Sequence, residues 1–115
     1  AGAKRPLWII RNGELLQFAG DKFSIGSQYW DNESFTNHSI SILPSDSIYL
    51  FSDGFADQFG GEHGKKLMTS NFREELISIQ NESMNVQGKL LGAYFEKWKG
   101  TNEQVDDVMV IGIKV

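Results

Sequence analysis

The stretch that decides the fold is Ile48-Tyr49-Leu50-Phe51-Ser52-Asp53-Gly54, an apolar run that ends abruptly in a turn signal. Four consecutive apolar residues suit a strand that is covered on both faces of its sheet. The turn signal puts a carboxylate, Asp53, at the rim of that sheet, where a ligand can reach it. The sequence therefore predicts an interior strand whose end carries an accessible charge.

A second acidic motif, Asp106-Asp107, directly precedes an apolar run from Val108 to Val115, which predicts another interior strand. If the two strands are antiparallel neighbours, Asp53 and Asp106 come to the same edge of the sheet. Carboxylates there are costly to desolvate unless a cation compensates, and Mg²⁺ or Mn²⁺ prefers such oxygen ligands. Taken singly, each motif is equally compatible with a solvated turn.

Further strands are predicted on both sides of this pair. Residues 6–18 are typical of a β-hairpin, because Asn12-Gly13 separates two apolar runs and both residues tolerate the positive φ of a type I′ turn. Residues 22–25 form a short segment between loops, and residues 27–37 have no clear period. Residues 38–43 alternate polar with apolar side chains, which predicts a half-buried strand.

Two helices follow a Gly-rich stretch at residues 60–64. The first is expected over 71–80, with Asn71 and Glu74 at the spacing of a capping box. The second is expected over 84–98, with Ser83 as N-cap and Gly100 at its C-terminal end. The order of elements predicts one α/β (α+β) domain over residues 1–115, with a helix pair packed against a mainly antiparallel sheet.

Bulk composition excludes several classes of protein. The 115 residues carry a formal net charge of −4, and the Lys and Arg residues are scattered, which argues against nucleic-acid binding. The absence of cysteine excludes disulfides and thiolate sites, and it fits a reducing, cytoplasmic setting. No apolar run approaches the roughly 20 residues of a membrane span. Since the chain opens at Ala1, we expect it to be a piece of a longer protein, which could be membrane-anchored elsewhere.

Other candidate sites are weaker. His38 and His63 lie far apart without companion ligands, so both are interpreted as structural or solvated. Ser52 lacks the Gly-x-Ser-x-Gly elbow of a serine nucleophile, and residues 60–64 lack the Gly-Lys-Ser/Thr ending of a P-loop. The aromatic stripe at Tyr94, Phe95 and Trp98 indicates core, although exposed apolar surface in a truncated domain would favour self-association.

Together the two acidic motifs resemble a known family. Residues 52–57 (Ser-Asp-Gly-Phe-Ala-Asp), followed about fifty residues later by 105–110 (Val-Asp-Asp-Val-Met-Val), look like the last two metal motifs of PPM-type protein phosphatases of the SpoIIE-like bacterial branch. Residues 1–7 also resemble that branch's entry into a hairpin, with Ala3 and Lys4 in place of His and Asn. The resemblance extends over essentially the whole chain.

The resemblance implies the C-terminal portion of an α-β-β-α sandwich that hydrolyses phosphoserine or phosphothreonine on a signalling protein. In such phosphatases two Mn²⁺ or Mg²⁺ ions activate the attacking water. By position, Asp53 and Asp106 would be metal ligands, and no side chain would act as nucleophile. Asp57 would serve a peripheral metal or its water, Asp107 would support the ligands or the turn, and Gly54 would let the backbone turn tightly beside the ion.

The chain also departs from the family in a larger respect. It lacks the earlier Asp and Gly-His-Gly-type segment, so we expect the N-terminal part of the domain to be absent and the fragment to be inactive alone. The family further implies an upstream sensor domain and a phosphorylated substrate such as an anti-sigma-factor antagonist. Two alternatives stay open: a non-catalytic interaction module that retains a degenerate phosphatase fold, and an α/β domain with one structural cation.

Overall fold

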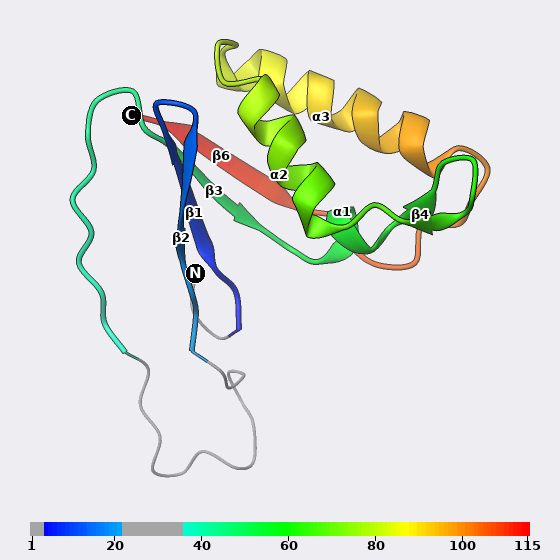
Figure 1. The fold of residues 1–115 in the computed structure, drawn as a ribbon, viewed down its shortest axis with the longest axis horizontal. Helices are drawn as coiled ribbons and strands as arrows, with labels where there is room; N and C mark the ends of the chain where they lie inside the picture. Colours follow the sequence, from blue (N-terminus) through cyan, green and yellow to red (C-terminus); the bar gives the residue numbers. More distant parts are fainter. Residues whose placement is uncertain (1–3, 22–35) are drawn as a thin grey trace, which may run out of the picture. The chain divides into compact units, whose positions relative to one another are not determined.

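The computed structural model describes residues 4–21 and 36–115, so the predictions for residues 1–3, 22–25 and 27–35 lie outside the described residues. The chain forms two compact units, one of residues 1–50 with 112–115 and one of residues 51–111. The described elements, shown in Figure 1, are β1 (Leu7–Arg11), β2 (Glu14–Phe18), β3 (Ser47–Phe51), α1 (Gly54–Asp57), β4 (Phe59–Gly60), β5 (Lys65–Lys66), α2 (Thr69–Ser78), α3 (Met84–Lys99) and β6 (Val110–Lys114).

The predicted fold class is confirmed. One sheet has four strands in the order β2-β1-β3-β6, and a second small sheet pairs β4 with β5. Strand β1 is antiparallel to both β2 and β3. The helices α2 and α3 form the expected pair, and the four-residue helix α1 is an addition that was too short for a periodic pattern to predict.

The hairpin of β1 and β2 forms as predicted. Arg11 lies opposite Glu14, so only Asn12 and Gly13 connect the strands. Their φ angles are 52° and 77°, which is the left-handed conformation that a two-residue type I′ connection requires. Local turn chemistry alone therefore specifies this register.

Strands β3 and β6 are neighbours in the sheet. The prediction that Asp53 and Asp106 share one edge of the sheet requires this arrangement. The backbone of Val115 exchanges hydrogen bonds with Ser45 and Asp46, at 3.0 and 2.9 Å, and Ser52 N donates to Met109 O at 3.0 Å. As the chain advances from Asp46 to Ser52, its hydrogen-bond partner goes back from Val115 to Met109, as in an antiparallel pair. The expectation that the two strands run antiparallel is confirmed.

The predicted strand over residues 38–43 is wrong, because none of the described residues 36–43 is in a strand. Polar groups of the partly buried ion pair between Arg11 and Asp46 satisfy this backbone instead of a sheet partner. Leu43 N donates to Asp46 Oδ2 at 2.8 Å, and Arg11 Nη2 donates to Ser41 O at 3.2 Å. The alternation of apolar residues therefore reflects a loop fastened by side chains.

The ion pair that fastens this loop is bidentate. Arg11 Nε and Nη2 donate to the two carboxylate oxygens of Asp46 at 2.9 and 2.7 Å, and the Asp46 side chain is only 1% exposed. The hydrogen bond from Arg11, followed by that from the Leu43 backbone, lowers the pKa of Asp46 to about 2. Two parallel charge-assisted hydrogen bonds make such a pair geometrically specific.

The unit of residues 51–111 has an aromatic core. The ring of Phe55 stacks on Phe72 with centroids 4.6 Å apart and lies 5.2 Å from that of Phe95. Phe51 meets Phe72 edge-on at 5.1 Å. Phe95 is buried, as the predicted stripe required, whereas Tyr94 and Trp98 are half-buried. Phe55, Phe72 and Phe95 therefore hold α1, α2 and α3 together.

The caps of the two long helices differ in how well they were predicted. Ser83 Oγ accepts from Val86 N at 3.3 Å and Gly100 ends α3 with a positive φ, so both predictions for α3 are confirmed. The predicted capping box of α2 is wrong, since the helix begins at Thr69 after Met68, whose φ is 78°. Asn71 lies inside α2 and donates to Leu67 O at 2.7 Å.

Candidate functional site

Asp53 lies where the strand ends. It follows β3 by two residues and precedes α1, whose first turn is closed by a hydrogen bond of 2.9 Å from Asp57 N to Asp53 O. Phe55, the second residue of α1, is buried in the aromatic core, while Asp53 is exposed. The apolar anchor thus fixes the backbone that presents the carboxylate to solvent.

Ser52 fastens the first acidic motif to the second. Its hydroxyl donates to Asp107 O at 2.8 Å and accepts from Met109 N at 3.0 Å, beside the backbone hydrogen bond from Ser52 N to Met109 O. From the sequence, Ser52 was considered as a side chain only for nucleophilic chemistry, and that role was rejected. Its structural role was missed, although a serine directly before the acidic turn was the available signal.

Gly54 has a packing role that the sequence did not predict. It begins a regular helix and is not among the described glycines with positive φ, and its role in a turn beside a metal ion stays a prediction. Gly54 gives room to the second motif, because an added Cβ would overlap Asp107 O and lie 2.8 Å from Asp107 C. The glycine therefore permits close approach of the two backbones.

Asp106 and Asp107 are both exposed in the turn that leads to β6. The Asp106 carboxylate accepts from Asp107 N at 2.8 Å, and Gln104 Nε2 donates to Asp106 O at 3.0 Å. Asp107 contacts the first motif through its backbone carbonyl, which accepts the Ser52 hydroxyl. The structure thus brings the two acidic motifs into contact within one unit.

Asp57 ends α1 and is half-buried. Its carboxylate lies 3.9 Å from Lys66 Nζ on β5, so a cationic side chain already stands beside it. Lys66 had no predicted role at the site, because a two-residue strand leaves no periodic signal that would place it there. The predicted role of Asp57 at a peripheral metal stays a prediction.

The chemistry of these donors fits part of a divalent centre. Asp53 and Asp106 supply accessible carboxylate oxygens, the ligand type that Mg²⁺ and Mn²⁺ prefer. Within residues 4–21 and 36–115, however, no three His, Cys, Asp or Glu side chains converge as a metal site would require. The two carboxylates thus suit a partial ligand set, and their role as ligands stays a prediction.

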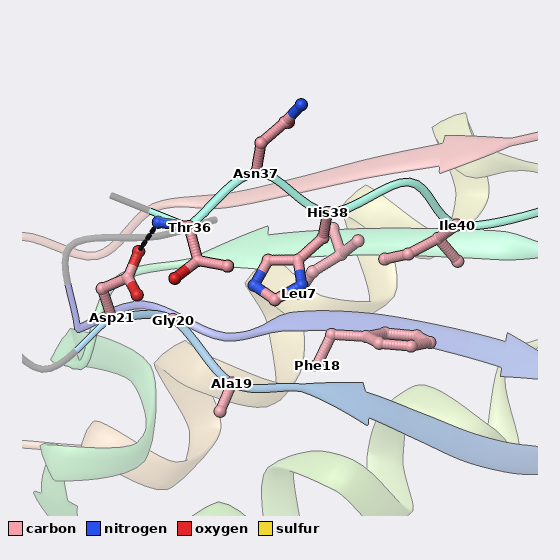
Figure 2. Close-up of a pocket in the computed structure, with 9 residues that line it drawn as sticks. All are labelled: Leu7, Phe18, Ala19, Gly20, Asp21, Thr36, Asn37, His38 and Ile40. Carbon is pink, nitrogen blue, oxygen red and sulfur yellow. Dashed lines mark hydrogen bonds between the residues drawn. The ribbon is translucent and has the colours of Figure 1, made fainter. Parts of the chain in front are cut away.

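The two histidines lie elsewhere. His63 is exposed in the turn between β4 and β5. His38 lines a cavity of about 230 Å³ within the other unit, where Figure 2 shows it among apolar side chains and near the hydrogen bond of 3.0 Å from Thr36 N to Asp21 Oδ2. No residue of either acidic motif lines this cavity, and we assign it no chemistry.

No helix of the described part of the chain has the length and apolar character needed to cross a membrane.

Comparisons with known proteins agree with the predicted resemblance. No protein-family model and no curated protein matches the sequence. Among solved structures, the chain is similar to the SiaA-PP2C domain of Pseudomonas aeruginosa, with a TM-score of 0.84 and 26% sequence identity. The match covers 98% of this chain and 44% of that one. The resemblance inferred from the acidic motifs is thereby confirmed, and the chain has the fold of part of a PPM-type (PP2C) phosphatase domain.

Proposed function

We propose that this chain supplies part of the catalytic centre of a SpoIIE-like protein phosphatase, which removes phosphate from phosphoserine or phosphothreonine on a signalling protein. The observation that carries the proposal is the contact between the two acidic motifs through Ser52 and Gly54, in a fold similar to a PP2C domain. That contact fixes both Asp-bearing segments against each other before any ligand binds.

In the proposed centre, Asp53 and Asp106 bind Mn²⁺ or Mg²⁺. The bound metal supplies Lewis acidity to the phosphoryl group and lowers the pKa of the attacking water. The chain's own residues do the positioning: Ser52 holds the turn before β6, and Phe55 anchors the helix behind Asp53. The remaining ligands come from outside the 115 residues, so the chain alone has little or no activity.

The proposed substrate class is supported by the likeness to a PP2C domain. The proposed substrate is a phosphorylated signalling protein, such as an anti-sigma-factor antagonist, and the parent protein carries a sensor domain upstream. The proposed location of such a domain is the cytoplasm. The net charge of −4 and the scattered basic residues support a protein substrate over a nucleic acid.

Metal binding is tested on the chain as it stands. Mn²⁺ titrated into ¹⁵N-labelled protein should broaden the amide signals of residues 52–54 and 106–108 first, because paramagnetic relaxation falls steeply with distance. Asp53→Asn and Asp106→Asn should each remove that broadening, while the exposed Glu82→Gln should leave it unchanged. Broadening that stays in Asp53→Asn, or that begins elsewhere, would show that the ligands are misassigned.

Activity is tested on an extended protein. Mn²⁺-dependent hydrolysis of an aryl phosphate should be at background for the 115 residues and measurable once the chain is extended upstream by about one half-domain. Asp53→Asn in the extended protein should return the rate to background, with Glu82→Gln as control. If the extended protein is also inactive, the interaction-module alternative becomes the better account.

A further inference from the structure

The short hairpin of β4 and β5 is rigidly held at its base. Gly61 N donates to Trp98 O at 3.0 Å, and Trp98 Nε1 donates to Gln58 O at 2.8 Å. Gly60 lies so close to α3 that an added Cβ would overlap Trp98 O. The hairpin therefore projects from α3 as a fixed element, and its orientation is set by buried contacts.

One face of this hairpin combines a cation with an aromatic ring. Phe59 is paired directly with Lys66, and cross-strand partners place their side chains on the same face. Lys66 Nζ lies 5.9 Å from the centre of the Phe59 ring, and both residues are exposed, Phe59 by 39%. Lys65 precedes Lys66 in the strand, so its side chain points to the opposite face.

The face of Phe59 and Lys66 adjoins Asp57, which lies one helical turn after the proposed metal ligand Asp53. Lys66 Nζ is 3.9 Å from Asp57 Oδ1, and Asp57 is joined to Asp53 by one helical turn through its backbone hydrogen bond. A peptide whose phosphorylated residue reaches Asp53 would have its neighbouring residues within reach of this face.

We propose that the face of Phe59 and Lys66 binds an acidic segment next to the phosphorylated residue of the protein substrate. Lys66 forms only a weak, exposed ion pair with Asp57 at 3.9 Å, so it attracts the carboxylates of that segment, and the exposed Phe59 ring contacts an apolar side chain beside them. The inference rests on the proposed function, because only that function brings a phosphoprotein to Asp53. It adds a surface that selects among phosphoproteins by the charge of their flanking residues.

The expected effect is moderate, since exposed ion pairs are screened by solvent. Reversing the charge at Lys66 replaces attraction with repulsion and should weaken binding by about threefold to tenfold at physiological salt. The effect should shrink as the ionic strength rises, because the Debye length shortens to about 3 Å at 1 M salt. Removal of the Phe59 ring should weaken binding by about twofold to fivefold.

The test measures binding alone. The probe is a fluorescein-labelled peptide with one phosphoserine flanked by glutamates and one leucine, titrated by fluorescence anisotropy with the 115-residue chain. Lys66→Glu should raise Kd by about threefold to tenfold, and Lys66→Gln should give a smaller rise. Lys65→Glu makes the same change of charge on the opposite face, and Lys89→Glu makes it on α3, so both should stay within about twofold.

Several results would overturn the proposal. One is that the probe does not bind, and another is that Lys65→Glu or Lys89→Glu weakens binding as much as Lys66→Glu does. A third is that an oligothymidylate competes as well as the unlabelled peptide, which would show a general attraction for polyanions. Far-UV circular dichroism of each variant excludes unfolding as the cause. Since no step depends on turnover, failure here leaves the Mn²⁺ test of Asp53 unaffected, and failure of that test leaves the peptide result interpretable.

Discussion

The close approach of Gly54 to the second acidic motif makes the sharpest prediction about stability. Gly54 begins a helix, where alanine is ordinarily the better residue by up to about 1 kcal/mol. The backbone of Asp107 and the side chain of Val108 oppose the substitution. The change in the free energy of unfolding caused by Gly54→Ala therefore tests whether the two motifs are packed against each other in solution.

The magnitude follows from the geometry. An added Cβ would lie 2.8 Å from Asp107 C and 2.9 Å from Val108 Cγ2, while ordinary van der Waals contact begins at 3.4 Å. The obstacle is backbone held by the Ser52 hydroxyl, and it would have to retreat by roughly 0.6 Å or more. Forcing one extra carbon into such a contact costs about 1–3 kcal/mol, which exceeds the gain in helix propensity.

Gly88 provides the matched control. It lies in α3, and an added Cβ would meet no atom within 4 Å. Gly88→Ala should therefore raise the free energy of unfolding by about 0.5–1 kcal/mol, whereas Gly54→Ala should lower it by about 1–3 kcal/mol. Urea denaturation followed by far-UV circular dichroism measures both. If Gly54→Ala equals or exceeds the wild-type stability while Gly88→Ala stabilises, the proposed contact between the motifs is refuted.

Two further predictions concern the ion pair and the helix cap. The pKa of Asp46 is about 2 in the folded chain, below the unfolded value of about 4, so its contribution to stability is present above pH 4 and is lost as the pH falls toward 2. Asp46→Asn should lower Tm at pH 7 and flatten the acid dependence of Tm between pH 5 and 2, and an unchanged acid limb in thermal scans would contradict the assignment. Ser83→Ala should cost about 1 kcal/mol in urea denaturation, because Val86 N loses its acceptor. Ser70→Ala, inside the first turn of α2, should cost nothing, and equal losses in both variants would show that the cap is not responsible.

The elements that are specified by residues within their own segment were predicted well. The hairpin of β1 and β2 follows from two turn residues that accept positive φ, and α3 follows from an N-cap and a terminal glycine within the segment itself. Elements without such residues were missed. The helix α1 has four residues and the strands β4 and β5 have two each, which is too short for any period to appear.

The errors have a common origin in distant partners. Residues 38–43 alternate like a strand, but their backbone is satisfied by Asp46 and by Arg11, which lies 30 residues away from Ser41 in sequence. The start of α2 was misplaced because Asn71 uses its side chain to hold Leu67 O. In both cases a side chain forms a hydrogen bond with a backbone group for which the local pattern had predicted a different partner.

The sequence by itself determined the two acidic motifs and the resemblance to PPM-type phosphatases, because Ser52-Asp53-Gly54 and Asp106-Asp107 stand in that order and spacing at the ends of apolar runs. Only the tertiary structure decided how the motifs meet. The hydroxyl of Ser52 bridges Asp107 and Met109, and Gly54 leaves the space that a side chain would fill. These contacts join residues more than fifty positions apart, and their geometry depends on antiparallel pairing and packing, which no local pattern encodes.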